Sequence, residues 1–191
     1  MELFKKIRLK IGNALLKKKM IRSKNNVCYS GFSQVKSIGI VWDASKTEEF
    51  SSLAKFHQRM HDRKIKVKII GYFPGKNLPD QYTAIRYLTC IRKNETNYFY
   101  HPVSSETNTF ISNHHDIIID INFNNHFPLK YITSLSKAGI KVGLFEPGNM
   151  NNSINLMLEI KKPVDIDNYL IQTIHYLEMI KDGTLKQSTK T

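Results

Sequence analysis

The sequence predicts a three-layer α/β domain of Rossmann-like type, with a mostly parallel sheet of about five strands and helices on both faces. Short apolar runs rich in β-branched residues alternate with segments of helical periodicity, which is the pattern of a parallel sheet. Residues 117–121, four isoleucines around Asp120, are typical of a central strand that is buried on both faces. With 191 residues and 41% hydrophobic residues, the chain is large enough to bury one such core.

Strands are expected at the apolar runs, at residues 37–42, 65–72, 97–101, 115–123, 140–145 and 154–160. Helices are expected in the periodic segments, at residues 45–64, 106–113, 128–137 and 165–181. Ser45 and Glu48 match a capping box at the start of the first helix, and Gly139 is expected to end the third. Residues 76–96 fit either a helix or an irregular excursion, so the pattern assigns no element to them.

The positive charge is concentrated near the N-terminus. The net charge is +13, and residues 1–24 hold nine basic side chains and one acidic one, or +8, which leaves +5 for the rest. The chain therefore divides into a basic helical arm (1–24), a polar connector (25–36), one α/β domain (37–183) and a polar tail (184–191) that is expected to fray.

The basic arm is predicted to be an amphipathic helix. Leu3, Ile7, Ile11 and Leu15 recur every four residues and so lie along one face. Three interpretations of this helix compete. Its apolar face docks on the arm's own domain, or the same face inserts into an anionic membrane. In the third, the basic side chains neutralise the phosphates of RNA. The basic residues expected to contact an anionic partner are Lys5, Lys6, Arg8, Lys10, Lys17, Lys18, Lys19 and Arg22.

Several classes of protein are excluded by what the sequence lacks. No stretch approaches the roughly 20 apolar residues that a membrane span needs. Lys10 and Lys17 interrupt any apolar core of a secretory leader. Two cysteines, Cys28 and Cys90, are too few for a disulfide framework or a four-cysteine zinc site. We therefore expect a cytoplasmic protein that associates with a membrane, if at all, only at its surface.

Polar side chains are expected at the carboxyl edge of the sheet, where ligands bind in open parallel sheets. Asp43 and Ser45 follow the first strand, and Asp120 and Asn122 end the Ile-rich strand. Two carboxylates at this edge would suit a hard cation such as Mg²⁺. The structural alternative is that Asp43 caps the helix that follows it, and we favour that alternative.

Neither a cofactor nor a metal is predicted. The turn after the first strand lacks the glycines of a dinucleotide site, and no phosphate-binding P-loop occurs. His57 and His61 have the spacing of two metal ligands on a helix, but no Glu accompanies them, so we expect partly exposed helix histidines. The domain shows no interleaved basic and aromatic surface, since Tyr98 and its aromatic neighbours have only Arg92 and Lys93 nearby.

Residues 116–145 resemble a family of uncharacterised small α/β proteins from Bacteroidota. The resemblance rests on the segments Asp-Ile-Ile-Ile-Asp-Ile-Asn, Phe-Pro-Leu-Lys-Tyr-Ile and Leu-Ser-Lys-Ala-Gly-Ile-Lys-Val-Gly, and it extends over about residues 35–185. It implies a cytoplasmic bacterial protein with this domain plan. The family has no assigned activity, so no site residues follow from it.

The leading hypothesis is a non-enzymatic binding protein whose basic helix contacts RNA or the ribosome. One alternative is peripheral association with an anionic membrane through the same helix. Another is an enzyme for a small molecule, with or without a metal, whose site lies at the carboxyl edge of the sheet. No catalytic motif is recognisable, and the sequence makes no prediction about oligomeric state.

Overall fold

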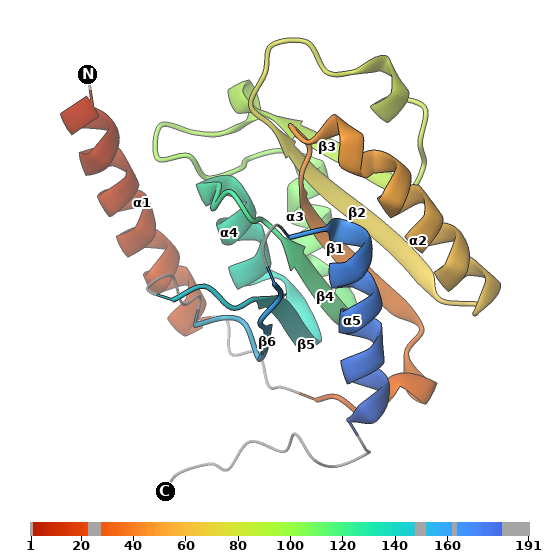
Figure 1. Ribbon diagram of the computed structural model, residues 1–191. Helices are drawn as coiled ribbons and strands as arrows, with labels where there is room; N and C mark the ends of the chain where they lie inside the picture. The colour runs from red at the N-terminus through yellow and green to blue at the C-terminus, as the bar shows by residue number, and fades with distance from the viewer. Residues whose placement is uncertain (1, 23–27, 148–151, 162–163, 181–191) are drawn as a thin grey trace, which may run out of the picture.

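The computed structural model describes residues 2–22, 28–147, 152–161 and 164–180, and its centre is a six-stranded parallel sheet (Figure 1). The strand order is β3-β2-β1-β4-β5-β6. The strands are β1 (Ser37–Asp43), β2 (Lys66–Phe73), β3 (Leu88–Arg92), β4 (His114–Ile121), β5 (Lys137–Leu144) and β6 (Leu156–Leu158). The Rossmann-like fold is confirmed, with six strands in place of the expected five or so.

Two helices cover each face of the sheet. The α-helices are α1 (Glu2–Arg22), α2 (Phe50–Asp62), α3 (Ser105–Ser112), α4 (Phe127–Leu135) and α5 (Ile166–Met179). Helices α2 and α5 bury Leu53, Tyr169 and Leu170 against one face of the sheet. On the other face, α4 buries Leu129 and Ile132. Both faces of the central strands are therefore inaccessible to solvent, which explains their continuous apolar sequences.

The order in which strands are added to the sheet reverses after β3: β2 and β3 lie on one side of β1, and β4, β5 and β6 lie on the other. Strand β1 pairs with β2 on one side and with β4 on the other, and all pairings are parallel. The carboxyl ends of β1 and β4 therefore lie side by side at the topological switch point, the place where ligands bind in sheets of this type. Asp43 ends β1 there, and Asp120 lies in β4 opposite Val41.

Three local expectations were wrong, and a segment to which no element was assigned forms a strand. The segment 97–101 forms no strand and makes only an isolated bridge between Thr96 and Pro102, whereas β3 lies inside the unassigned 76–96 region. Gly139 lies within β5, because α4 ends at Leu135. The capping box does not form: a short 3₁₀ turn intervenes and α2 begins at Phe50 with no side-chain cap.

Helix α1 forms as expected and packs on the outer side of α4 (Figure 1). It is not long and apolar enough to cross a membrane, nor is any other described helix. Part of the predicted connector belongs to the core, because Tyr29 and Phe32 are buried and the Tyr29 hydroxyl donates to the Leu177 carbonyl (2.8 Å). The predicted polar tail at 184–191 lies outside the described residues.

Candidate functional site

Asp43 is the centre of a hydrogen-bond network at the switch point. One carboxylate oxygen accepts from the Ser45 amide (3.1 Å) and hydroxyl (2.6 Å). The other accepts from the Asn124 side chain (2.6 Å) and lies 3.2 Å from His126 Nε2. Burial alone would raise the pKa of Asp43, but the contacts with His126, Ser45 and Asn124 outweigh it and hold the pKa well below its usual value.

Asn122 closes the loop between β4 and α4. Its side chain donates to the His126 carbonyl (2.9 Å) and accepts from the His126 amide (2.7 Å). Asn125, inside this loop, has a positive φ of 57°, which asparagine tolerates better than most residues. Asn122 therefore shapes the loop that brings Asn124 and His126 onto Asp43.

Asp120 is buried beneath the same loop, beside a buried lysine. Its carboxylate accepts from the Asn122 amide (2.9 Å), and burial raises its pKa to about 6 despite the nearby positive charge of Lys141. Burial likewise lowers the pKa of Lys141 to about 8, and its ammonium donates to the Ser134 carbonyl (3.1 Å). The Thr133 hydroxyl is also buried beside Asp120. It makes no well-formed hydrogen bond to a described residue, but its closeness to the carboxyl opposes the rise in the Asp120 pKa.

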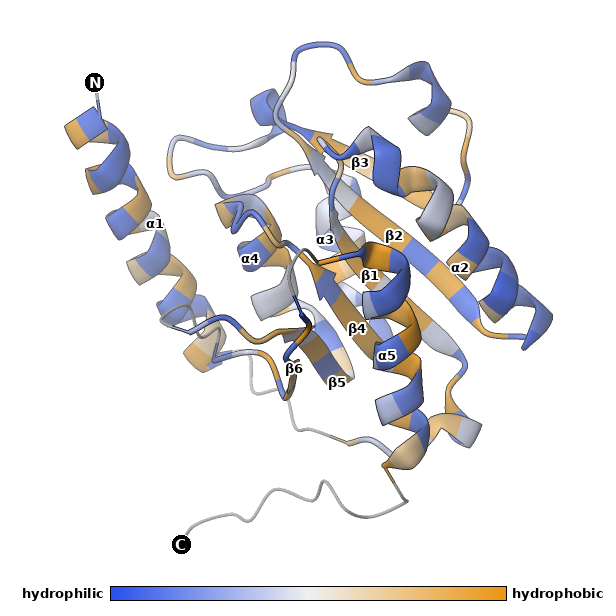
Figure 2. Cartoon of the chain, in the orientation of Figure 1, coloured by the Kyte–Doolittle hydropathy of each residue, from blue (hydrophilic) through white to orange (hydrophobic). Residues whose placement is uncertain are grey.

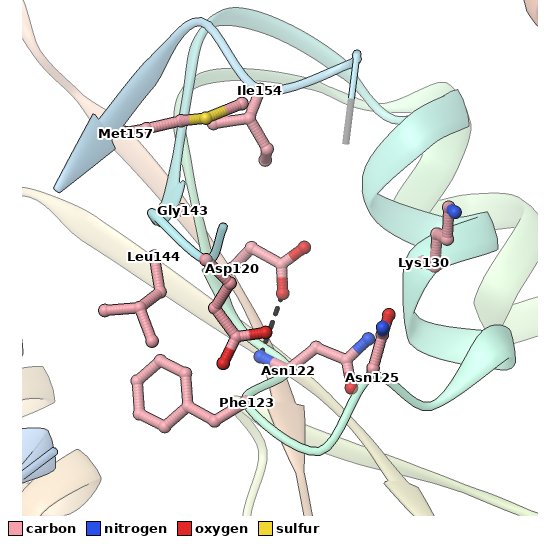
Figure 3. Close-up of a pocket in the computed structure, with 10 residues that line it drawn as sticks. Asp120, Asn122, Phe123, Asn125, Lys130, Gly143, Leu144, Ile154 and Met157 are labelled. Carbon is pink, nitrogen blue, oxygen red and sulfur yellow. Dashed lines mark hydrogen bonds between the residues drawn. The ribbon is translucent and has the colours of Figure 1, made fainter. Parts of the chain in front are cut away.

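A small pocket opens beside Asp120 at the ends of β4 and β5 (Figure 3). Its volume is about 50 Å³, which is room for a few water molecules and not for a dinucleotide. Figure 3 shows polar side chains of the β4–α4 loop on one wall and apolar side chains on the other. The lining residues are Asp120, Asn122, Phe123, Asn125, Lys130, Gly143, Leu144, Glu146, Ile154 and Met157.

The structure brings the four predicted residues Asp43, Ser45, Asp120 and Asn122 together at the sheet edge. Their hydrogen bonds are made to one another and to the β4–α4 loop, so they stabilise the local fold. Asp43 contacts Ser45, Asp120 contacts Asn122, and the loop that Asn122 closes links the two pairs. Both Asp43 oxygens are already occupied by donors, which leaves little room for a metal at this carboxylate. Within the described parts of the chain, no cluster of three or more His, Cys, Asp or Glu residues could hold an ion.

Helix α1 docks through a face that the sequence pattern did not single out. Gly12 and Leu16 are buried, and Leu16 packs against Phe127 and Tyr131 of α4. The Gly12 carbonyl lies 3.0 Å from the buried His101 ring. Gly12 is needed at this crossing, because a Cβ there would approach the Phe99 carbonyl to 2.6 Å.

Two of the eight basic candidates in α1 are used within the chain. The Arg8 guanidinium donates to the Tyr98 carbonyl (2.7 Å) and lies over the rings of Tyr98 and Tyr100. The Lys19 ammonium donates to the Tyr131 hydroxyl (2.7 Å). The other six are exposed: Lys5, Lys6, Lys10, Lys17, Lys18 and Arg22.

The predicted apolar stripe of α1 is exposed over three of its four positions. Leu3, Ile7 and Ile11 remain 68%, 47% and 41% accessible, and Leu15 is half-buried. Phe4, beside the stripe, is 70% accessible. Figure 2 shows hydrophobic residues recurring along the whole of α1 among hydrophilic ones. The helix therefore has two apolar faces, one docked on α4 and one turned to solvent.

Replacing Gly12 with leucine is expected to detach α1 from α4. The added side chain would collide with the Phe99 carbonyl and the Phe127 ring, and overpacking of this kind costs about 1–3 kcal/mol. Trypsin should then cut the lysines of α1 about tenfold faster or more, while the sheet domain stays folded. Ala14→Leu, on the exposed side of the same helix, is the matched control. Equal protection of α1 in both variants would contradict the docking contacts.

One family model, described as a family of unknown function (DUF6913), matches residues 5–180. The chain belongs to this family. The membership confirms the resemblance to a family without assigned activity, and the match covers most of α1 as well as the sheet domain.

No curated protein matches the chain. Among solved structures, the E. coli heptosyltransferase WaaC with ADP is similar, with 12% identity and a TM-score of 0.40. That match covers 81% of this chain and 49% of the other, so the chain spans about half the length of that protein. A likeness of this degree carries no argument about activity.

Sequence reasoning missed one surface altogether. The expectation that the domain has no interleaved basic and aromatic surface was wrong, because β2 and the segment before β3 bring Lys66, Lys68, Arg86 and Tyr87 to one groove. Arg86 and Tyr87 lie in the 76–96 region that the sequence pattern left unassigned. A recognised β3 would have placed them beside β2.

Proposed function

We propose that the protein binds the surface of an anionic membrane through the exposed face of α1. The observation that carries this proposal is the exposure of Leu3, Phe4, Ile7 and Ile11 on a helix that is already docked by its other side. A helix that lies in the plane of a membrane interface needs such an apolar face with lysines around it.

The positions around the helix fit this orientation. At about 100° per residue, Leu3, Ile7 and Ile11 fall within about 80° of one another, roughly 160° from the centre of the docked face. Lys6, Lys10 and Lys17 cluster along one edge of this apolar strip, and all three are exposed. With the strip facing the lipid, these ammonium groups would reach the headgroups.

The energetics support reversible binding. Burying the exposed parts of these four side chains, which are 41% to 70% accessible, would contribute about 4 kcal/mol. Three lysines at an anionic surface would add about 3 kcal/mol. The sum is enough for surface association and far below the strength of a transmembrane anchor.

Other occupants of the strip fit less well. Two copies of this chain paired through it would bring their lysines together, and like charges disfavour that arrangement. RNA would use the lysines but would leave the exposed Leu3, Phe4 and Ile7 without a role. RNA binding by α1 stays a prediction. An anionic membrane is the partner that would use both the exposed apolar side chains and the lysines.

Vesicle flotation of the full chain tests the proposal. The protein should float with vesicles that contain phosphatidylglycerol and remain unbound with phosphatidylcholine alone, with weaker binding at high salt. Phe4→Ser/Ile7→Ser should lower the partition coefficient about tenfold or more, because about 2 kcal/mol of apolar burial is lost.

The matched control is Ile171→Ser/Met179→Ser, which removes two equally exposed apolar side chains from α5. This control should float like the unmodified chain. Equal loss in both variants, or equal binding to neutral vesicles, would overturn the proposal. Release from vesicles by added RNA would instead favour RNA as the partner of α1.

A further inference from the structure

A groove runs along the part of β2 that β3 leaves uncovered. Pairing of β2 with β3 begins only at Ile69 and Leu88, so Lys66–Lys68 has β1 as its neighbour on one side only. The groove lies between this open edge, the C-terminal half of α2 and the residues before β3, with a volume of about 640 Å³. Its lining residues are His57, His61, Lys64, Ile65, Lys66, Val67, Lys68, Arg86 and Tyr87.

The groove is strongly cationic. Lys64, Lys66, Lys68 and Arg86 are exposed, and none of the lining residues is acidic. The acid nearest in sequence, Asp62, accepts from Gln58 at the rim and lies 4.0 Å from the His61 ring. Lys66 and Lys68 alternate with the buried Val67, so they point to the same side of the strand about 6.6 Å apart. A chain of phosphates laid along this edge would meet successive positive charges.

Three rings form a stack at the wall of the groove. The Tyr87 and His57 rings lie 3.7 Å apart and 15° from parallel, and the His61 ring follows 6.3 Å from His57 at 22°. His61 is 74% exposed and ends the stack toward solvent. Burial, the neighbouring His61 and Lys68 lower the pKa of His57, which favours the uncharged imidazole within the stack.

We infer that this groove binds single-stranded RNA. Positive charges that track a backbone, beside aromatic faces on which bases stack, are the two parts of a single-strand binding surface. An acidic peptide would use the charges but would have no use for the ring stack. The groove lies beside α2, at the opposite edge of the molecule from α1 (Figure 1), so membrane binding and RNA binding would not compete for one surface.

Fluorescence anisotropy with a labelled RNA of about 12 nucleotides tests the inference on the full chain. Lys66→Gln/Arg86→Gln should weaken binding about tenfold or more at low salt and reduce the slope of log affinity against log salt by about 1.4, the effect of two lost phosphate contacts. His61→Ala should weaken binding about fivefold or more through lost base stacking, with a smaller change of slope.

The matched control is Lys76→Gln/Lys93→Gln, which removes two exposed charges elsewhere and should bind like the unmodified chain. Polyglutamate should compete poorly with the labelled RNA. Lack of RNA binding, equal loss in the groove and control variants, or competition by polyglutamate as strong as that by unlabelled RNA would overturn the inference. Loss only on Lys5→Gln/Lys6→Gln would overturn it as well, because it would place the RNA on α1.

Discussion

Replacing Asp43 with alanine is expected to destabilise the protein by about 3–5 kcal/mol. The carboxylate is almost fully buried and accepts from Ser45 and Asn124, with the His126 ring 3.2 Å from the same oxygen that Asn124 uses. Its removal leaves these donors without their acceptor and opens the contact between β1 and the β4–α4 loop. Urea unfolding followed by circular dichroism measures the loss.

The stabilisation that Asp43 provides is expected to decrease in acid. The folded-state pKa of Asp43 lies below its unfolded value of 3.8, so its contribution to stability is full above about pH 4 and is lost as the pH falls further. The difference between Asp43→Ala and the unmodified chain should therefore shrink in acid. Asp43→Asn keeps the volume of the side chain but replaces one acceptor by a donor. Its stability should lie between those of Asp43→Ala and the unmodified chain. An unchanged urea midpoint for Asp43→Ala would contradict the network.

Replacing Lys141 with methionine is expected to cost about 3 kcal/mol at neutral pH, because it removes the positive charge beside the buried Asp120. The pKa of Asp120 should then rise above its present value of about 6. The double variant Asp120→Asn/Lys141→Met should recover most of this loss, since it leaves no buried charge.

The pair also predicts an unusual pH profile. The raised pKa of Asp120 lowers stability as the pH rises from about 4 to 6, and the lowered pKa of Lys141 restores stability as the pH rises from about 8 to 10.5. The contribution of the pair is therefore least favourable between pH 6 and 8, and the double variant should lose both transitions. A single variant as stable as the unmodified chain would contradict the buried pair.

The sheet was predictable from sequence where its strands are buried on both faces, because β1 and β4 each contain an apolar run rich in β-branched residues, at 38–42 and 117–119. Strand β3 was not, since Thr89 and Arg92 give it the polarity of an edge strand. The segment 97–101 was predicted to be a strand because it is rich in aromatic residues, which are common in strands. Its aromatic residues lie beside α1, where Arg8 covers the Tyr98 and Tyr100 rings, and they belong to no sheet.

The candidate surfaces depended on contacts that sequence patterns do not contain. The four-residue repeat that includes Leu3, Ile7 and Ile11 marked an apolar face of α1 correctly, but the docked face is set by Gly12 and Leu16 meeting α4. Which of two apolar faces docks is decided by the shape of the partner helix. The groove beside β2 likewise joins residues about 20 positions apart, and only the pairing of β2 with β3 brings them together.

The depth of α1 in a bilayer tests the central claim most directly. The chain has one tryptophan, Trp42, which is fully buried, so a Phe4→Trp variant adds a single exposed reporter on the face proposed to meet lipid. With anionic vesicles, its added emission should shift to the blue and be quenched by lipids brominated in the acyl chain. Emission that stays that of a water-exposed indole, without quenching, would contradict membrane insertion of this face.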